Sequence, residues 1–227
     1  MRPPSPSGAW PCRRRRALLL AAAAAGLAGV SHAAPAPTRQ QALRALDDPR
    51  PARRAAAVDR LAEVGTMADA ARVADRLHDA DPTVHERAAV ALWQIWSRSG
   101  DRAIDRQLLR GVQQMQSGEL EAALKTFDGV VRRKPDFAEG WNKRATVLYL
   151  LGRDVESLRD CDAVLARNPL HFGALSGMAQ IHLRRDDPES ALRAYERALA
   201  INPHLDGGPE FLRLLEETVR RRGGQRT

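Results

Sequence analysis

The chain has 227 residues, a length that suits one or two domains with a hydrophobic core. Its 44% hydrophobic residues exclude a disordered protein and its two cysteines exclude a disulfide scaffold, while a formal charge of +8 raises the question of a nucleic-acid or membrane partner. Only 4% of the residues are aromatic, and alanine, leucine and arginine are abundant, which favours helices over strands.

The chain begins with a basic block and an apolar run. Arg13 to Arg16 precede the apolar run 17–30, and Ser31-His32-Ala33 supplies small residues for a cleavage site. This order predicts a secretory signal peptide over residues 1–33, because a membrane span needs about 20 apolar residues. We expect a periplasmic protein with no stable membrane span after cleavage. General secretion is the favoured route, and twin-arginine export stays open.

The positive charge lies mostly at the two ends of the chain. Residues 1–33 contain five arginines and no acidic residue, and four more arginines follow Thr218. Residues 34–218 are therefore close to neutral and lack the distributed basic surface that binding to phosphates requires. We expect no nucleic-acid partner. A polyanion binder that uses the C-terminal arginines is an alternative.

Two related segments follow a short proline-rich leader, residues 34–37. Asp48-Pro49 recurs as Asp81-Pro82, and each pair predicts a helix N-cap followed by a proline in the first turn. The shared pattern Asp-Pro-x-x-x-x-Arg-Ala-Ala resembles HEAT-like helical repeats. The resemblance implies two helix pairs over residues 38–100 that stack directly onto the first helices after Gly100.

One fixed period organises the rest of the chain. Pro135, Pro169 and Pro203 are equally spaced, at the length of a helix-pair repeat. At the same offset, two columns of small residues mark places where helices approach closely, and a large residue follows the second column by four positions. These columns are Gly111, Ala145 and Ala179; Ala123, Ser157 and Ala191; and Phe127, Cys161 and Tyr195.

Turn residues support the same three units. Gly118 and Gly152 fall between the two helices of the first and second units. Asp186-Asp187-Pro188 takes this place in the third unit and supplies an N-cap and a proline for the first helical position.

The pattern resembles the tetratricopeptide repeat, whose units contain W-x2-L-G-x2-Y, then A-x3-F, then P. Ala123-x3-Phe127 and Ala191-x3-Tyr195 match it, whereas the middle unit departs from it at Arg144, Ser157 and Cys161. The resemblance implies an all-α fold, an α-solenoid of stacked antiparallel helix pairs with a concave groove. HEAT-like pairs would be followed by three tetratricopeptide units within residues 101–205 (about 104–137, 138–171 and 172–205), a capping helix over 208–222 and a disordered tail over 223–227. The packed face of the cap would hold Phe211, Leu214, Leu215 and Val219.

The sequence contains no catalytic motif and no cluster of metal ligands. Cys161 lies in the column of large packing residues, so we expect a buried free thiol rather than a nucleophile. Trp93, Trp96 and Trp141 are expected in the core rather than in an aromatic cage. We therefore predict a non-enzyme with no cofactor and no metal site. A cryptic metal-binding or hydrolytic protein is the alternative from another class.

The resemblance also implies that the first helix of each unit lines the groove through its positions 2, 5, 9 and 12. The candidate groove residues are Leu108, Val112 and Met115; Glu139, Asn142, Thr146 and Tyr149; and Ser176, Gln180 and Leu183. Met115 and Tyr149 suit an apolar side chain of an extended peptide, and Asn142 and Gln180 suit its backbone. Acidic residues at position 2, Asp105 and Glu139, argue against a clamp for a C-terminal carboxylate.

The predicted function is that of a non-catalytic scaffold for another protein or an extended peptide, similar to secreted bacterial tetratricopeptide proteins. An oligomerisation or envelope-assembly scaffold that uses its outer faces is the alternative. The sequence leaves the identity of the partner and the oligomeric state open.

Overall fold

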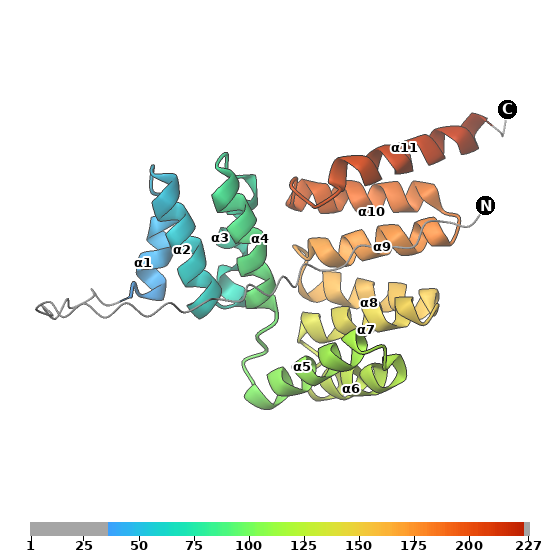
Figure 1. Ribbon diagram of the computed structural model, residues 1–227, viewed down its shortest axis with the longest axis horizontal. Coiled ribbons are helices and arrows are strands. Elements are labelled where there is room, and N and C mark those ends of the chain that lie inside the picture. The colour runs from blue at the N-terminus through green and yellow to red at the C-terminus, as the bar shows by residue number, and fades with distance from the viewer. Residues whose placement is uncertain (1–35, 225–227) are drawn as a thin grey trace, which may run out of the picture. The chain divides into compact units, whose positions relative to one another are not determined.

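A computed structural model describes residues 36–224 of the chain, and this part is entirely helical, with no strand (Figure 1). The all-α prediction is confirmed for these residues. The predicted signal peptide and the last three residues of the predicted tail lie outside the described range. Within that range no helix combines the length and the apolar character that crossing a membrane requires.

Four α-helices and two short 3-10 helices form the N-terminal part. They are α1 (Arg39–Ala45), α2 (Pro51–Val64), η1 (Met67–Asp69), α3 (Ala70–Ala74), η2 (Asp75–His78) and α4 (Pro82–Trp96). Helices α2 and α4 pack against each other. Val58 and Leu61 of α2 and Val84 and Leu92 of α4 have no exposed surface, so an apolar core lies between these two helices.

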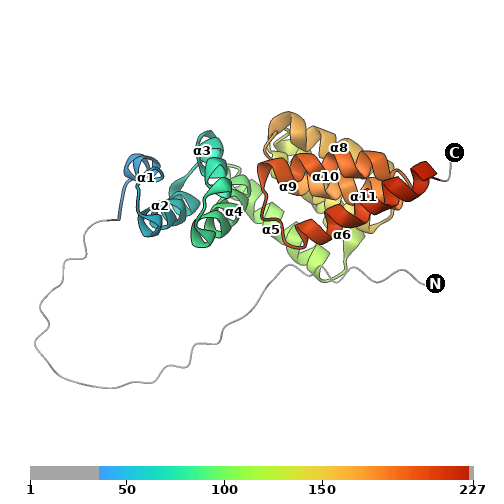
Figure 2. The same cartoon turned by 90° about the horizontal axis from the view of Figure 1, so that it is seen from above.

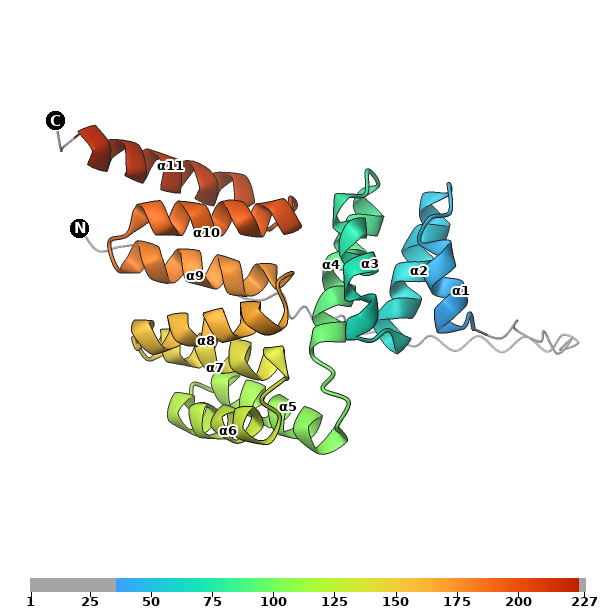
Figure 3. The ribbon, with the colours of Figure 1, turned by 180° about the vertical axis from the view of Figure 1, so that it is seen from behind.

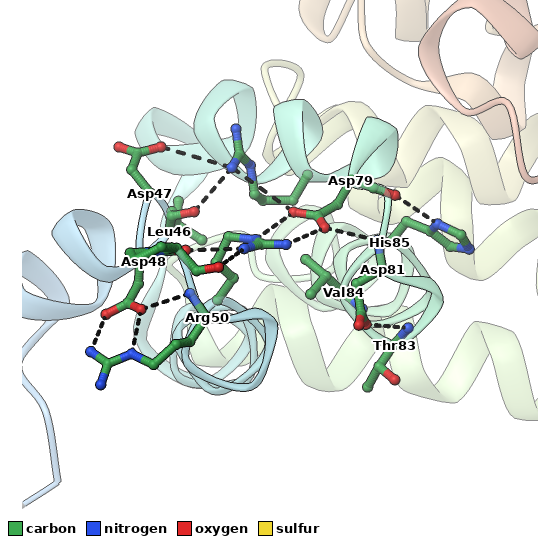
Figure 4. A network of polar contacts seen from close by, with 12 residues as sticks. Leu46, Asp47, Asp48, Arg50, Asp79, Asp81, Thr83, Val84 and His85 are labelled. Atoms are coloured by element: carbon green, nitrogen blue, oxygen red, sulfur yellow. Dashed lines mark hydrogen bonds and ion pairs between the residues drawn. The ribbon is translucent and has the colours of Figure 1, made fainter.

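The two Asp-Pro pairs play different roles. Asp81 is the N-cap of α4, where its carboxylate accepts the backbone N–H groups of Thr83 at 2.9 Å and Val84 at 3.3 Å (Figure 4). Asp48 does not cap α2, and the expectation of an N-cap there is wrong. Pro51 holds the residue before it in an extended conformation, so α2 begins at Pro51 and not at Pro49.

Asp48 instead belongs to a polar network between α2 and the loop before α4 (Figure 4). Arg54 donates to both carboxylate oxygens of Asp79, each at 2.7 Å, and to the backbone carbonyl of Asp48 at 3.0 Å. The hydrogen bonds from Arg54 lower the pKa of Asp79. The network fixes the loops at one end of the α2–α4 pair.

Six helices of similar length follow as three antiparallel pairs. They are α5 (Arg102–Gln116) with α6 (Leu120–Arg133), α7 (Ala138–Leu150) with α8 (Asp154–Arg167), and α9 (Phe172–Arg184) with α10 (Pro188–Ile201). Seen from behind, α7 to α10 follow one another in a row (Figure 3). Gly118 and Gly152 have φ angles of +79° and +75° in the turns, and Asp186 adopts φ +60° in the third turn, where Asp187 caps α10.

The predicted columns of small and large residues pack against each other inside the helix pairs. Phe127 has no exposed surface, and a Cβ atom at Gly111 would lie 2.5 Å from its Cε1 atom, so only glycine fits opposite this ring. In the second pair Ala145 packs in one cluster with Cys161, which is 3% exposed. The predicted buried free thiol at Cys161 is confirmed, and burial raises its pKa to about 12.

The middle unit replaces apolar packing by polar contacts at the positions where it departs from the repeat pattern. Arg144 donates to both carboxylate oxygens of Asp160, each at 2.7 Å, and to Asp128 at 2.9 Å. Ser157 donates its hydroxyl to the carbonyl of Ala145 at 2.7 Å. These bonds satisfy polar groups that would otherwise be costly to bury.

Helix α11 (Gly208–Gly224) lies against α10 (Figure 2). Leu215 has no exposed surface, and Phe211 meets the ring of Tyr195 edge-on at 4.7 Å. Leu214 is 49% exposed, so its predicted place on the packed face is wrong, because it lies about 100° around the helix from Leu215. Gly223 and Gly224, expected in the tail, belong to the helix.

Candidate functional site

The groove candidates on α5 lie mainly in the core of the first unit. Leu108 is 3% exposed and packs with Ile104 and Phe127. Val112 and Met115 are half-buried against the same apolar cluster. These side chains therefore contribute more to the packing of α5 on α6 than to an open surface.

The candidates at the start of α7 are buried in a polar cluster. Glu139 has no exposed surface and Asn142 is 7% exposed. The Asn142 amide donates to Glu139 Oε2 at 3.1 Å, and Lys143 Nζ lies 2.9 Å from Glu139 Oε1. Residues predicted to contact a peptide are thus closed off from solvent in this structure.

His171 completes the cluster from the adjacent helix. Its Nδ1 atom accepts the backbone N–H of Ala174 at 3.0 Å and so caps α9. Because Nδ1 accepts, the ring proton sits on Nε2, which donates to Glu139 Oε2 at 3.0 Å. Burial of Glu139 opposes its ionisation, but Lys143 and His171 outweigh it and lower the pKa of Glu139 to about 2.

Two tryptophans of α4 cover this cluster. Trp96 stacks on the His171 ring at 4.6 Å, and Trp93 meets the rings of His171 and Phe172 edge-on at 5.2 and 5.6 Å. A Cβ atom at Gly173 would lie 2.5 Å from Trp93 Cη2, so the glycine makes room for this ring. We call the polar cluster and the residues that the two tryptophan rings contact the docking face: Glu139, Asn142, Lys143, His171, Phe172 and Gly173.

The position of α4 differs from the expected stacking onto the first unit. Its tryptophans lie against residues of the second and third units, and its His85 stacks on His204 after α10 at 3.6 Å. The apolar core of α1–α4 is continuous with that of α9–α11, whereas the first unit has a separate cluster. Trp93 and Trp96 are packed as predicted, but at a contact between distant helices.

The remaining candidates lie on α7 and α9, which contact each other, and none of them is fully buried. We call these residues the open strip: Thr146, Tyr149, Ser176, Gln180 and Leu183. Gln180 is exposed and the other four are half-buried. The Thr146 hydroxyl donates to the carbonyl of Asn142 at 2.9 Å, so this side chain offers mainly its methyl group.

Arg184 fixes one end of the open strip. Its guanidinium lies 3.7 Å from the centre of the Tyr149 ring, donates to the Tyr149 carbonyl at 3.0 Å and pairs with Asp154. A Cβ atom at Gly177, seven residues earlier on α9, would meet no atom within 4 Å. The strip therefore combines a held aromatic ring, an exposed amide and unfilled space above α9.

The docking face and the open strip are not suited to bind a metal ion. Among residues 36–224, no group of three or more His, Cys, Asp or Glu side chains is placed to hold a metal ion.

Trp141 is half-buried, and the guanidinium groups of Arg144 and Arg167 both lie over its ring. Its indole N–H donates to the carbonyl of Pro135 at 2.9 Å.

The three antiparallel helix pairs recur at the spacing of the three prolines, and each has the same columns of small and large residues. This arrangement defines a helical repeat protein. Residues 108–169 and 172–205 both match the tetratricopeptide repeat family. These residues therefore contain tetratricopeptide repeats.

Two relatives are similar to part of the chain. A TPR repeat-containing protein of Rhizobium etli is 36% identical over 132 residues, which are 58% of this chain and 63% of the relative. A DnaJ homolog subfamily C member 7 homolog of Dictyostelium discoideum is 26% identical over 106 residues, 45% of this chain and 20% of the relative. The chain thus spans less than two thirds of either relative.

Solved structures share the fold at low sequence identity. The Sgt2 TPR domain from Aspergillus fumigatus has a TM-score of 0.52 at 16% identity and covers 54% of this chain and 83% of its own. The first TPR of Spaghetti (RPAP3), bound to the HSP90 peptide SRMEEVD, has a TM-score of 0.50 at 19% identity, covering 52% and 93%. A MamA protein has a TM-score of 0.50 at 16% identity, covering 70% and 87%.

Proposed function

We propose that the protein is a non-catalytic scaffold that binds an extended segment of another protein along the open strip. The tetratricopeptide repeats in residues 108–169 and 172–205, and the likeness to a domain solved with a bound peptide, support this role. The observation that carries the proposal is the combination of Tyr149, held by Arg184, with exposed Gln180 and the unfilled space at Gly177. An aromatic anchor beside a polar group suits a side chain and a backbone amide of the same peptide.

The open strip can be tested by photo-crosslinking from its exposed residue. With benzoylphenylalanine in place of Gln180, cells that express the full chain should yield a defined covalent adduct with a second protein. Adding Tyr149→Ala should reduce this adduct at least fivefold, because the substitution removes the aromatic anchor. Quantitative mass spectrometry of the adduct is the measurement.

The control carries the crosslinker at Glu196, which is exposed on α10, the second helix of the third unit. An adduct at Glu196 but not at position 180 would contradict the proposal. If that adduct had twice the mass of the chain, it would favour an oligomerisation scaffold that uses its outer faces.

We also propose export to the periplasm, which rests on the sequence Arg13 to Ala33 alone. N-terminal sequencing of the protein recovered from a periplasmic fraction should begin at Ala34. A chain that keeps Met1 and stays in the cytoplasmic fraction would refute the export proposal and leave the open strip unaffected.

The C-terminal arginines favour a structural role over binding to a polyanion. Arg222 donates to the backbone carbonyl of Asp186 in the turn before α10, and Arg221 pairs with Glu217 at 3.2 Å. Both contacts lie within the chain, close to the negative end of the α11 dipole.

A further inference from the structure

Helix α4 carries two adjacent apolar faces, and only one of them packs on α2. Val84, Ala88 and Ile95 are buried on the first face. The second face holds His85, Ala89, Trp93 and Trp96, at spacings of four, four and three residues. Such a stripe is what an amphipathic helix uses to sit in the groove of a binding partner.

The second face of α4 lies on a cluster that includes positions which the resemblance to tetratricopeptide repeats implies would face a ligand. Glu139 and Gly173 are at position 2 of their units, and Asn142 is at position 5. Glu139 is wholly buried, and Gly173 is the residue whose missing side chain admits Trp93. Helix α4 therefore lies on the docking face as a ligand would.

The contact between α4 and the docking face carries polar costs. The indole nitrogen of Trp96 is buried with no hydrogen-bond partner. The charged pair of Glu139 and Lys143 is largely removed from water beneath the tryptophans. Because desolvation of such groups offsets part of the gain from packing the rings, α4 is held less firmly here than its buried surface suggests.

A short segment connects α4 to the first repeat unit. Residues 97–101 connect α4 to α5, and Gly100 adopts φ +80° with open space around it. Arg98 donates to the carbonyls of Ala62 and Gly65, which attaches the start of the segment to α2. Ser99 donates its backbone N–H and its hydroxyl to Asp105 Oδ1 of α5, at 2.8 and 2.6 Å, so the attachment changes from α2 to α5 between these two residues. The apolar core of α1–α4 is continuous with that of α9–α11, but α4 contacts α2 through a different face from the one on the docking face, so the two helices can leave it together.

We propose that α4 is a displaceable ligand held in cis, and that the docking face binds an amphipathic helix of another protein carrying two aromatic side chains three residues apart. Helix α4 and the helix of the partner cannot occupy the docking face at the same time, so release of α4 controls access to this face. The tether keeps α4 at an effective concentration in the millimolar range, which a partner must overcome. The inference rests on the proposed function only in that the scaffold binds protein.

The test uses the full chain and a fluorescein-labelled peptide with the sequence of residues 81–98 as the probe. Fluorescence anisotropy should show weak binding to the wild type. Trp93→Ala weakens the hold of α4, so this variant should bind the probe at least tenfold more tightly. Adding Gly173→Leu should abolish the gain, because the new side chain fills the place of the probe's own tryptophan. Adding Gly177→Leu instead, four residues further along α9, should preserve it.

Equal binding of the probe by the wild type and a folded Trp93→Ala variant would overturn the proposal, since α4 would then be a permanent part of the packed structure. If Trp93→Ala does not fold, trypsin cleavage of the native wild type after Arg98 decides. If the free energy of the opening that permits cleavage depends on urea much less steeply than global unfolding does, displacement of α4 is supported. If the chain is cleaved only when it unfolds globally, displacement of α4 is refuted. The crosslink from position 180 does not require Trp93, so failure of the open strip is distinguishable from failure of this inference.

Discussion

Replacing Phe127 by alanine is expected to lower the free energy of unfolding by about 3–5 kcal/mol, the cost of emptying a buried aromatic site. Phe127 has no exposed surface and its ring fills the space opposite Gly111. Because a repeat unit contacts mainly its neighbours, the loss should concentrate in α5 and α6. Urea denaturation followed by circular dichroism, with hydrogen exchange of residues 102–133, measures both effects.

Leu109→Ala is the matched control, since Leu109 is 61% exposed on the same helix pair. It should change the free energy of unfolding by less than about 0.5 kcal/mol. A loss below about 1 kcal/mol for Phe127→Ala, or equal losses for both variants, would show that the first unit is not packed as described.

Replacing Glu139 by alanine is expected to cost about 3–5 kcal/mol, as for other buried charged groups that lose one partner. The substitution leaves Lys143 and the Nε2 proton of His171 without their common acceptor. Glu121→Ala is the control, because Glu121 also lies in the first turn of its helix but is exposed. Comparing the stability losses of the two variants separates the contribution of the buried network from that of the helix dipole, which is about 0.3–1 kcal/mol.

The same variant should change the response to acid. The pKa of Glu139 is about 2 in the folded chain, against about 4.3 for an unperturbed glutamate. A lowered folded-state pKa means that the carboxylate stabilises the fold fully above about pH 4.3 and loses this effect as the pH falls through about 2. The stability difference between wild type and Glu139→Ala should therefore shrink between pH 5 and pH 2. A constant difference would contradict the assigned network.

Much of the repeat architecture could be predicted because it is encoded locally. Gly118 and Gly152 take positive φ angles in turns where other residues would be strained, and Asp187 with Pro188 starts α10 as their residue types indicate. Gly111 faces Phe127 because small and large residues recur at one spacing. Where a local rule failed, as at Asp48, a nearby proline decided the helix start.

The candidate site was only partly predictable. Thr146, Tyr149 and Gln180 lie on adjacent helices as the repeat pattern implies, whereas Glu139 and Asn142 are buried. The roles of Trp93, His171 and Gly173 did not follow from the period, since Trp93 precedes the first unit. One signal was present: Trp93 and Trp96 add apolar surface beyond the stripe of α4 that packs on α2.

The sequence by itself determined the helices, their turns, the constant period of the repeat and the columns that join each pair, because these depend on residues close together in the chain. Only the tertiary structure decided that α4 lies on the second and third units, far along the chain, and that it closes part of the expected groove. That choice depends on the fit of Trp93 over Gly173 and of Trp96 on His171. Such complementarity exists between two surfaces, and neither surface shows it in its own sequence pattern.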